Sequence, residues 1–260
     1  MKMKKKYIAL LMVCSLILGG CRGTAGKNTV NSLKDLEGKT IGVQMKTTGD
    51  AYASDIKDAS VKRFNKGKDA VKALEKGIVD AVMLDDAPAK VFEEEISGVR
   101  ILKEPYAKEE YGIAVNKEEQ ELLQKISQAL DELEKAGTLE MIKKKWLQDG
   151  GITTAYKSKK KKHKGGELIM ATNAEFPPYE SKTKSGKVVG IDVDIMKAVC
   201  DELDMTLKIS DTAFDSVVPS VERKMADVGV AALTITDERK EKVDFTQPYM
   251  EATQVILVRK

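Results

Sequence analysis

Few side chains in this sequence could carry out catalysis. Its single histidine, His163, stands inside a run of lysines, and its three cysteines are Cys14, Cys21 and Cys200. Nucleophilic catalysis by serine or cysteine needs a histidine base that a third group orients. The sequence contains no CxxC pair and no cluster of His and Cys at metal-ligand spacing. We therefore expect no enzyme of these classes, no metal site and no other cofactor.

Charged and aromatic side chains remain, and they suit binding. Arg239 stands in the segment TITDERKEK, Asp85 directly follows the apolar run Ala81–Leu84, and Phe176 precedes two prolines. Each has a purely structural alternative: Arg239 as one more charge on an exposed helix, Asp85 as a helix N-cap, and Phe176 as core. Residue types alone leave both interpretations open. Cys200, at helical spacing from apolar neighbours, is predicted to be a small core residue.

The elements that would position these residues alternate between strand-like and helix-like patterns. Short β-type runs occur at Thr40–Val43, Ala81–Leu84, Leu168–Thr172, Thr206–Ile209, Val228–Ala231 and Val255–Val258. Helical patterns occur at Asp69–Lys76, Glu119–Leu133, Leu139–Leu147, Asp192–Leu203 and from Pro219 to about Met225. This alternation predicts an α/β protein with mostly parallel sheets.

The distribution of charge argues against a nucleic-acid-binding protein. The chain of 260 residues has a formal net charge of +3, with 42% hydrophobic and 33% charged residues, as in a soluble globular protein. Ten lysines lie in two short runs, at 2–6 and 157–164, and without them 34 basic residues face 41 acidic ones. We therefore expect no nucleic-acid partner. Residues 151–166, which hold the second run, are predicted to be an exposed linker, with a patch that binds anionic surfaces as the alternative.

The first 33 residues have the pattern of an export signal. Residues 1–20 combine a lysine-rich start, a short apolar stretch and a small-residue exit, which indicates a signal peptide. Leu18-Gly19-Gly20-Cys21 also resembles the bacterial lipoprotein cleavage box, which predicts a lipid on Cys21 and a polar leash over 21–33. The protein would then be extracytoplasmic, either anchored to the outer face of the cytoplasmic membrane or periplasmic. The alternative is a plain secretory signal with a chance cysteine.

Several segments together resemble one protein family. They are DLEGKTIGVQ (35–44), VDAVMLDDAPA (79–89), YGIAVNK (111–117), AGTLEMIKKKW (136–146), MATNAEFPPYE (170–180), VGIDVDIMKAV (189–199) and TITDERKEKVDFTQPY (234–249). This set closely resembles the bacterial extracellular solute-binding proteins of family 3, the polar amino-acid receptors of ABC importers. The resemblance covers nearly everything from residue 34 to 260 except the linker. It implies a two-lobed α/β fold of the type II periplasmic-binding-protein kind, with two hinge strands.

The order of these segments differs from the order usual in the family. Members normally begin with the TNAEFPPYE-like segment and end at the KKW-like helix, whereas here the DLEGK half comes first. This is the arrangement of a circular permutant whose usual ends are joined through the Lys-rich linker. It implies a small lobe of residues 34–107 plus 254–260, and a large lobe with hinges of 108–150 plus 167–253. Val255–Val258 would then lie in the same lobe as Thr40–Val43.

The resemblance also implies a site for a free α-amino acid, formed by both lobes. Arg239 matches the family's carboxylate-binding arginine, whose planar fork offers two parallel charge-assisted bonds. Asp85 matches the acid that receives the α-ammonium group. The other matching positions supply hydroxyl and backbone contacts, a turn before a helix, and aromatic walls: Gln44, Thr47, Thr48, Asn173, Phe176, Phe214, Ala232 and Thr234.

Two positions depart from the family's pattern and bear on the ligand. Ala232 stands where many members have Gly, and its methyl group would narrow the pocket. Asn173 stands where several members that select cationic or amide side chains have Asp. With Glu175 and Asp215 close in sequence, we expect a polar or basic amino acid. Arginine, lysine, glutamine and cystine all stay open.

These features predict a receptor outside the cytoplasm that closes over an L-amino acid and delivers it to an ABC import permease. We expect a monomer that is not an enzyme. Three alternatives stay open: a periplasmic enzyme of the dehydratase kind on the same fold, a ligand-sensing module, and a lipoprotein whose Lys-rich linker binds anionic membranes.

Overall fold

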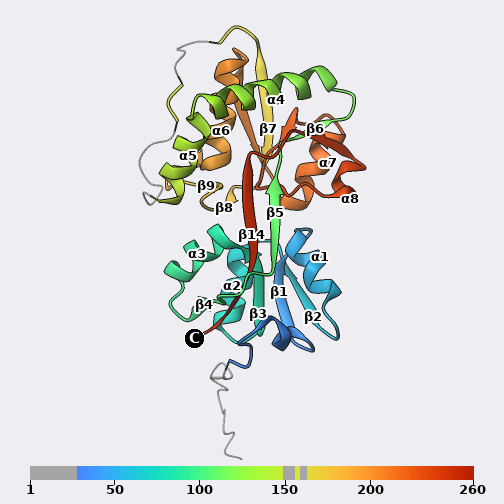
Figure 1. The fold of residues 1–260 in the computed structure, drawn as a ribbon, viewed down its shortest axis with the longest axis vertical. Helices are drawn as coiled ribbons and strands as arrows, with labels where there is room; N and C mark the ends of the chain where they lie inside the picture. Colours follow the sequence, from blue (N-terminus) through green and yellow to red (C-terminus); the bar gives the residue numbers. More distant parts are fainter. Residues whose placement is uncertain (1–27, 149–155, 159–162) are drawn as a thin grey trace, which may run out of the picture.

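Two lobes, each built on a mixed β-sheet with helices around it, are joined by two neighbouring strands (Figure 1). The structure is a computed structural model that describes residues 28–148, 156–158 and 163–260. The predicted signal peptide, Cys21 and most of the Lys-rich linker lie outside the described residues. None of the helices within these ranges is long and apolar enough to span a membrane.

The first lobe has one sheet with helices on both faces. Its strands, in spatial order, are β2 (Ser60–Phe64), β1 (Thr40–Gln44), β3 (Ala81–Asp85), β14 (Met250–Arg259) and β4 (Val99–Ile101). Around the sheet lie η1 (Leu33–Leu36), α1 (Thr48–Asp55), α2 (Gly67–Glu75) and α3 (Asp86–Glu95). The C-terminal strand β14 thus lies in the same sheet as β1, although the two are far apart in sequence.

Alternation of side chains along the strands divides the core of this lobe in two. On β3, Val82 and Leu84 pack in the cluster that contains α2 and α3, whereas Ala81 and Met83 pack in the cluster on the side of α1. Successive side chains of a strand point to opposite faces, and both faces are covered here. The strand is therefore apolar throughout, which is why its sequence shows a continuous apolar run.

The second lobe has a sheet in the order β11 (Thr206–Asp211), β7 (Glu167–Thr172), β12 (Val228–Gly229), β6 (Ala114–Asn116) and β13 (Val243–Phe245). A smaller antiparallel sheet holds β10 (Val188–Val189), β9 (Glu180–Lys182) and β8 (Glu175–Phe176). The helical elements of this lobe are α4 (Gln120–Lys135), α5 (Thr138–Leu147), α6 (Ile191–Glu202), η2 (Phe214–Ser216), α7 (Val217–Glu222) and α8 (Asp237–Lys240).

The apolar face predicted for the longest helix is confirmed. Ile126, Leu130 and Leu133 of α4 are buried, and the helix packs on α5 and α6. Cys200, on α6, is 2% exposed and lies in the same core, as predicted. Burial raises the pKa of its thiol to about 12, so the thiol is not poised for chemistry.

The prediction of mostly parallel sheets is wrong. β1 runs parallel to β2 and β3, and β7 runs parallel to β11 and β12. However, β14 is antiparallel to β3 and β4, and β6 is antiparallel to β12 and β13. β14 and β6 are the strands that arrive from the other lobe, so they enter each sheet in the opposite direction. Strand–helix alternation in the sequence carries no signal of this crossing.

The two strands that join the lobes are β5 (Ala107–Tyr111) and the first half of β14. They pair antiparallel, with Ala107 opposite Gln254 and Tyr111 opposite Met250, and run side by side between the lobes (Figure 1). The resemblance implies two hinge strands, and β5 and the first half of β14 occupy the place between the lobes where such strands would lie (Figure 1). Two paired strands that connect two lobes are the kind of connection about which hinge closure occurs.

Most described residues of the linker are exposed, in line with the prediction, but Tyr156 is buried against the large lobe. Tyr156 is 9% exposed, and its hydroxyl donates to Asp201 Oδ2 of α6 at 3.0 Å. His163 Nε2 lies 3.2 Å from Asp201 Oδ1 on the same helix. An aromatic ring with a polar tip can cover an apolar surface while its hydroxyl reaches a carboxylate. Composition alone conceals this docking, because Tyr156 stands among polar residues.

Candidate functional site

One cavity between the lobes gathers all ten of the residues predicted for the site. Together with Ala231, its lining comprises Gln44, Thr47, Thr48, Asp85, Asn173, Phe176, Phe214, Ala232, Thr234 and Arg239. The space between their atoms is narrow and partly open to solvent. Gln44 and Asp85 end strands of one sheet, and Asn173 and Ala232 follow strands of the other. Ligands of open α/β sheets bind at such carboxyl ends of strands.

Asp85 forms the acidic pole of this cavity. It is 6% exposed and is the N-cap residue of α3, yet its side chain makes no capping hydrogen bond. Instead, the hydroxyl of Tyr111 donates to one carboxylate oxygen, and Gln254 Nε2 donates to the other at 2.7 Å. Burial, followed by the nearby charge of Glu109, raises the pKa of Asp85 to about 7. The helix-cap alternative therefore does not account for this side chain.

Arg239 forms the basic pole, from the short helix α8. The Thr236 hydroxyl caps that helix by accepting from Arg239 N at 3.2 Å. The guanidinium donates from Nη1 to the Thr234 carbonyl at 2.7 Å and from Nη2 to the Lys46 carbonyl at 3.3 Å. Its Cζ lies 5.5 Å from the ring centre of Phe214, within cation–π range. Burial lowers the pKa of Arg239, and the nearby carboxylates oppose that effect, so the group stays charged.

The turn between β1 and α1 presents the start of a helix to the cavity. Thr47 is the N-cap of α1: its Oγ1 accepts from Asp50 N at 3.2 Å and donates to the Gln44 carbonyl at 2.8 Å. Thr48, the first residue of the helix, is buried at the cavity. The start of a helix carries a partial positive charge, which supports an anionic group placed there.

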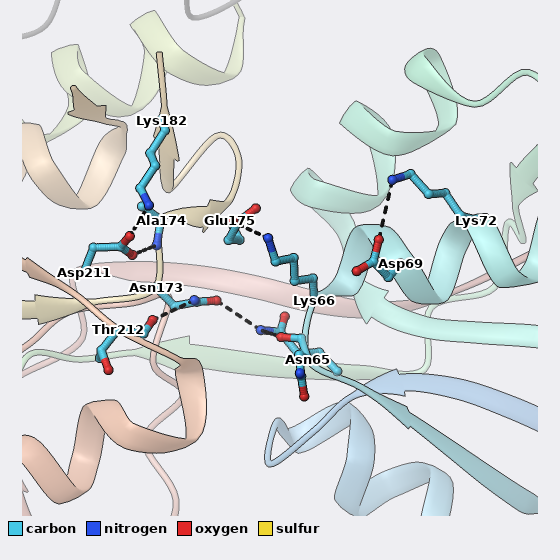
Figure 2. A network of polar contacts seen from close by, with 11 residues as sticks. Asn65, Lys66, Asp69, Lys72, Asn173, Ala174, Glu175, Lys182, Asp211 and Thr212 are labelled. Carbon is cyan, nitrogen blue, oxygen red and sulfur yellow. Dashed lines mark hydrogen bonds and ion pairs between the residues drawn. The ribbon is translucent and has the colours of Figure 1, made fainter. Parts of the chain in front are cut away.

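Three contacts cross from one lobe to the other. Gln44 Nε2 donates to Asn173 Oδ1 at 3.1 Å, Lys66 Nζ donates to Glu175 Oε1 at 2.8 Å, and Arg239 donates to the Lys46 carbonyl. Figure 2 shows the contact between Lys66 and Glu175. It also shows that the amide nitrogen of Asn173 donates to the Thr212 carbonyl. In this structure the two lobes are therefore in direct contact.

A second hollow continues outward from the cavity, since Asn173 and Phe214 line both. Its carboxylates are Glu175, Asp211 and Asp215, and its ammonium group is that of Lys66. Two of these carboxylates are ion-paired, Glu175 with Lys66 and Asp211 with Lys182 (Figure 2). This outer hollow lies beyond Phe176 and Phe214, the aromatic walls of the cavity. Phe176 belongs to both the core cluster and the cavity lining, so its structural and binding interpretations hold together.

Four residues around the site were missed by sequence reasoning. Ala231 lines the cavity, and Tyr111, Gln254 and Glu109 surround Asp85 or its partners. In the sequence, Glu109 and Glu110 are two adjacent glutamates that nothing distinguishes. Only the period of two along a strand could have shown that one of them points inward.

The geometry suits a zwitterion. A carboxylate from one lobe and a guanidinium from the other line a single small cavity, with hydroxyl and amide groups between them. Among the described residues, no group of three His, Cys, Asp or Glu side chains is placed to hold a metal ion.

Known proteins resemble part of this chain. Residues 168–260 match the model of the bacterial extracellular solute-binding proteins, family 3. A probable histidine-binding protein of Neisseria gonorrhoeae is 42% identical over 91 residues, which are 35% of this chain and 34% of that protein. The ABC transporter arginine-binding protein 1 of Escherichia coli K12 is 35% identical over 94 residues, which are 36% of this chain and 39% of that protein.

Solved structures give a similar result. An ancestral arginine-binding protein bound to arginine is 39% identical, over 34% of this chain and 38% of that one, with a TM-score of 0.32. The chain spans between 34% and 39% of the length of the two curated relatives above. Residues 168–260 are thus similar to the bacterial extracellular solute-binding proteins of family 3, and the described chain as a whole forms two α/β lobes.

Proposed function

We propose that this protein is an extracytoplasmic receptor that closes over a free L-α-amino acid and delivers it to an ABC import permease. The observation that carries the proposal is the placement of Asp85 and Arg239 in one cavity, although they come from different lobes. In this proposal Arg239 binds the ligand carboxylate and Asp85 binds its α-ammonium group. A ligand that touches both lobes stabilises the closed form by its differential affinity for it.

The remaining lining residues take supporting roles in the same proposal. The start of α1, at Thr47 and Thr48, and the hydroxyl and backbone of Thr234 surround the polar head of the ligand. Phe176 and Phe214 enclose its side chain, which would extend past Asn173 toward the outer hollow. The Gln44–Asn173 contact occupies polar groups that would otherwise face the ligand side chain.

A cationic side chain fits this path best. The outer hollow carries Glu175, Asp211 and Asp215, of which the first two pair with Lys66 and Lys182, and carboxylates favour a guanidinium or ammonium group. The relatives named above are described as arginine- and histidine-binding proteins, which supports the same ligand class. We therefore infer that arginine is the first ligand to test, with lysine, histidine and glutamine next.

A thermal-shift screen against the twenty amino acids and cystine tests the proposal, because a ligand that binds only the folded state raises its melting temperature. Calorimetry on Arg239→Lys, with Arg223→Lys as the control on an exposed arginine, then tests the site. Loss of the planar fork should cost about 1.5–3 kcal/mol, or about 10- to 100-fold in Kd, while the control stays unchanged. Silence across the panel would refute the amino-acid proposal.

We also infer that the two halves of the chain stand in swapped order relative to the family. The matched segment, 168–260, is the second half of this chain. A comparison that follows chain order aligns only one of two swapped halves at a time, which supports this inference. In the structure, Val30 packs with Ile256 and Val258, and Arg100 Nη2 donates to Asn31 Oδ1 at 3.4 Å. Residues near 30 and near 260 are thus neighbours, as a permuted chain requires.

Export and lipid attachment complete the proposal and rest on the sequence of residues 1–21. Lipid on Cys21 would hold the receptor at the membrane beside its permease. The substitution Cys21→Ser should move the protein from the membrane to the soluble extracytoplasmic fraction, and fractionation of the cells that express it measures this change.

A further inference from the structure

Glu109 is a buried carboxylate on the hinge strand β5, beside the site. It is 5% exposed, whereas its neighbour Glu110 is exposed. Burying a carboxylate is costly unless hydrogen bonds compensate for the lost water. The partners of Glu109 therefore indicate what the fold gains from placing it there.

Besides Tyr52, which interacts with Glu109 from α1, its partners are Thr234, which lines the cavity, and Gln254, which bonds Asp85. Thr234 Oγ1 donates to Glu109 Oε2 at 3.0 Å, and Gln254 Nε2 donates to the same oxygen at 3.1 Å. Gln254 Nε2 also donates to Asp85 Oδ1 at 2.7 Å. One amide nitrogen thus links the carboxylate of Glu109 to that of Asp85. Among the described atoms, Glu109 Oε1 is buried without a hydrogen-bond partner.

These contacts determine whether the Thr234 hydroxyl acts as a donor or as an acceptor toward the cavity. A hydroxyl has one proton and two lone pairs, and the proton of Thr234 is committed to Glu109. Toward the cavity its oxygen can only accept. It is thereby suited to an ammonium N–H and unsuited to a carboxylate oxygen. The amide nitrogen of Gln254 likewise donates its protons to Asp85 Oδ1 and Glu109 Oε2. These contacts hold both carboxylates in place as acceptors.

Backbone pairing keeps Thr234 next to this strand. Tyr111 and Thr234 form an antiparallel bridge, and Ile235 N donates to the Glu110 carbonyl at 2.9 Å. Thr234 belongs to the large lobe, and Asp85 ends a strand of the small lobe. Glu109 stands between them on the hinge, so its contacts tie together groups from both lobes.

We propose that Glu109 is a positioning residue for the ammonium subsite: by accepting the Thr234 hydroxyl proton and a Gln254 amide proton, it makes Thr234 and Asp85 joint acceptors for the ligand's α-ammonium group. This inference rests on the proposed function and adds a specificity determinant to it. Discrimination between an amino acid and the same acid without its α-amino group then depends on Glu109, although Glu109 need not touch the ligand.

The test measures Kd for the best amino acid of the panel and for its analogue that lacks the α-amino group. Glu109→Gln should weaken the amino acid by about 10- to 100-fold, the range for hydrogen bonds that involve a charged group. The des-amino analogue should change by less than about threefold, since it makes no use of these acceptors. Glu110→Gln is the matched control, one residue along the same strand, and should leave both constants unchanged.

The outcomes separate this inference from the proposed function. If wild-type protein binds none of the amino acids, the proposed function fails. If it binds one and Glu109→Gln lowers both affinities equally, or neither, the positioning role is overturned. Should Glu109→Gln fail to fold by circular dichroism, Thr234→Val decides: it removes the hydroxyl that donates to Glu109 and accepts from the ligand, and it must lower the same discrimination for the inference to stand.

Discussion

At the residue scale, the pKa of Asp85 predicts how binding depends on pH. Burial first, and the charge of Glu109 next, raise this pKa to about 7. Only the ionised carboxylate attracts an ammonium group, so protonation competes with the ligand. We expect amino-acid affinity to fall as pH drops through about 7, approaching about tenfold per unit well below it. Calorimetry between pH 5 and 8 measures this.

The stability of the ligand-free protein should follow the opposite trend. The folded-state pKa of Asp85 lies above its ordinary value of 3.8, so between about 4 and 7 the folded state binds more protons than the unfolded state. The contribution of Asp85 to stability is therefore present in full below pH 4 and is lost as pH rises through 7. Asp85→Asn should reduce the pH dependence of affinity and the pH dependence of stability, whereas Asp86→Asn should leave both as they are. Equal pH profiles for wild type and Asp85→Asn would contradict this assignment.

The site residues were predictable to the extent that their neighbours form recognisable motifs. Arg239 and Asp85 stand in such motifs, and both line the cavity. Glu109, Gln254 and Tyr111 were not predictable, because their roles arise from contacts between β5, β14 and β3. A buried glutamate and an exposed one look the same in a sequence. The fold decides between them, and that decision depends on pairing over long separations.

At the scale of elements, strands and helices were predictable where one apolar pattern dominates. The strand of Ala81–Leu84 and the helix of Glu119–Leu133 have such patterns, and both form. Helix α1 was implied only by the family resemblance and not by its own pattern, because it begins with Thr48 and Gly49 and carries few large apolar residues, so its period is weak. It forms at this place because Thr47 caps it and the sheet covers it.

Gly190, between β10 and α6, occupies a position where only glycine fits. Gly190 has φ +148°, and a Cβ there would lie 1.9 Å from the Tyr179 carbonyl oxygen. Gly190→Ala should therefore destabilise the protein by more than about 3 kcal/mol, since both backbone strain and a steric clash oppose it. Gly186→Ala is the control: φ is +81°, and nothing lies within 4 Å of its added Cβ. It should cost about 1 kcal/mol. Urea unfolding measures both, and equal costs would contradict the clash.

At the scale of the whole molecule, the order of the segments matters less than their contacts. β14 pairs with β3 and β4 across more than half of the sequence, and β5 pairs with β14 at the hinge. None of these pairings requires a particular chain order, because the segments near residues 30 and 260 are neighbours. The lobes and the cavity should therefore survive if the chain is opened elsewhere.

A variant in swapped order tests this directly. It begins at Tyr156, runs to Lys260, continues through a short Gly-Ser linker to Asn28 and ends at Gln148, so that every described contact outside the new joint is kept. Loop-closure entropy varies slowly with loop length, so stability should change by about 1 kcal/mol, or about 2–4 °C in melting temperature. The ligand ranking in a thermal-shift panel should be the same as that of the original order, with Kd for the best ligand unchanged. An unfolded variant, or one with a different ligand ranking, would show that the chain order itself shapes the site.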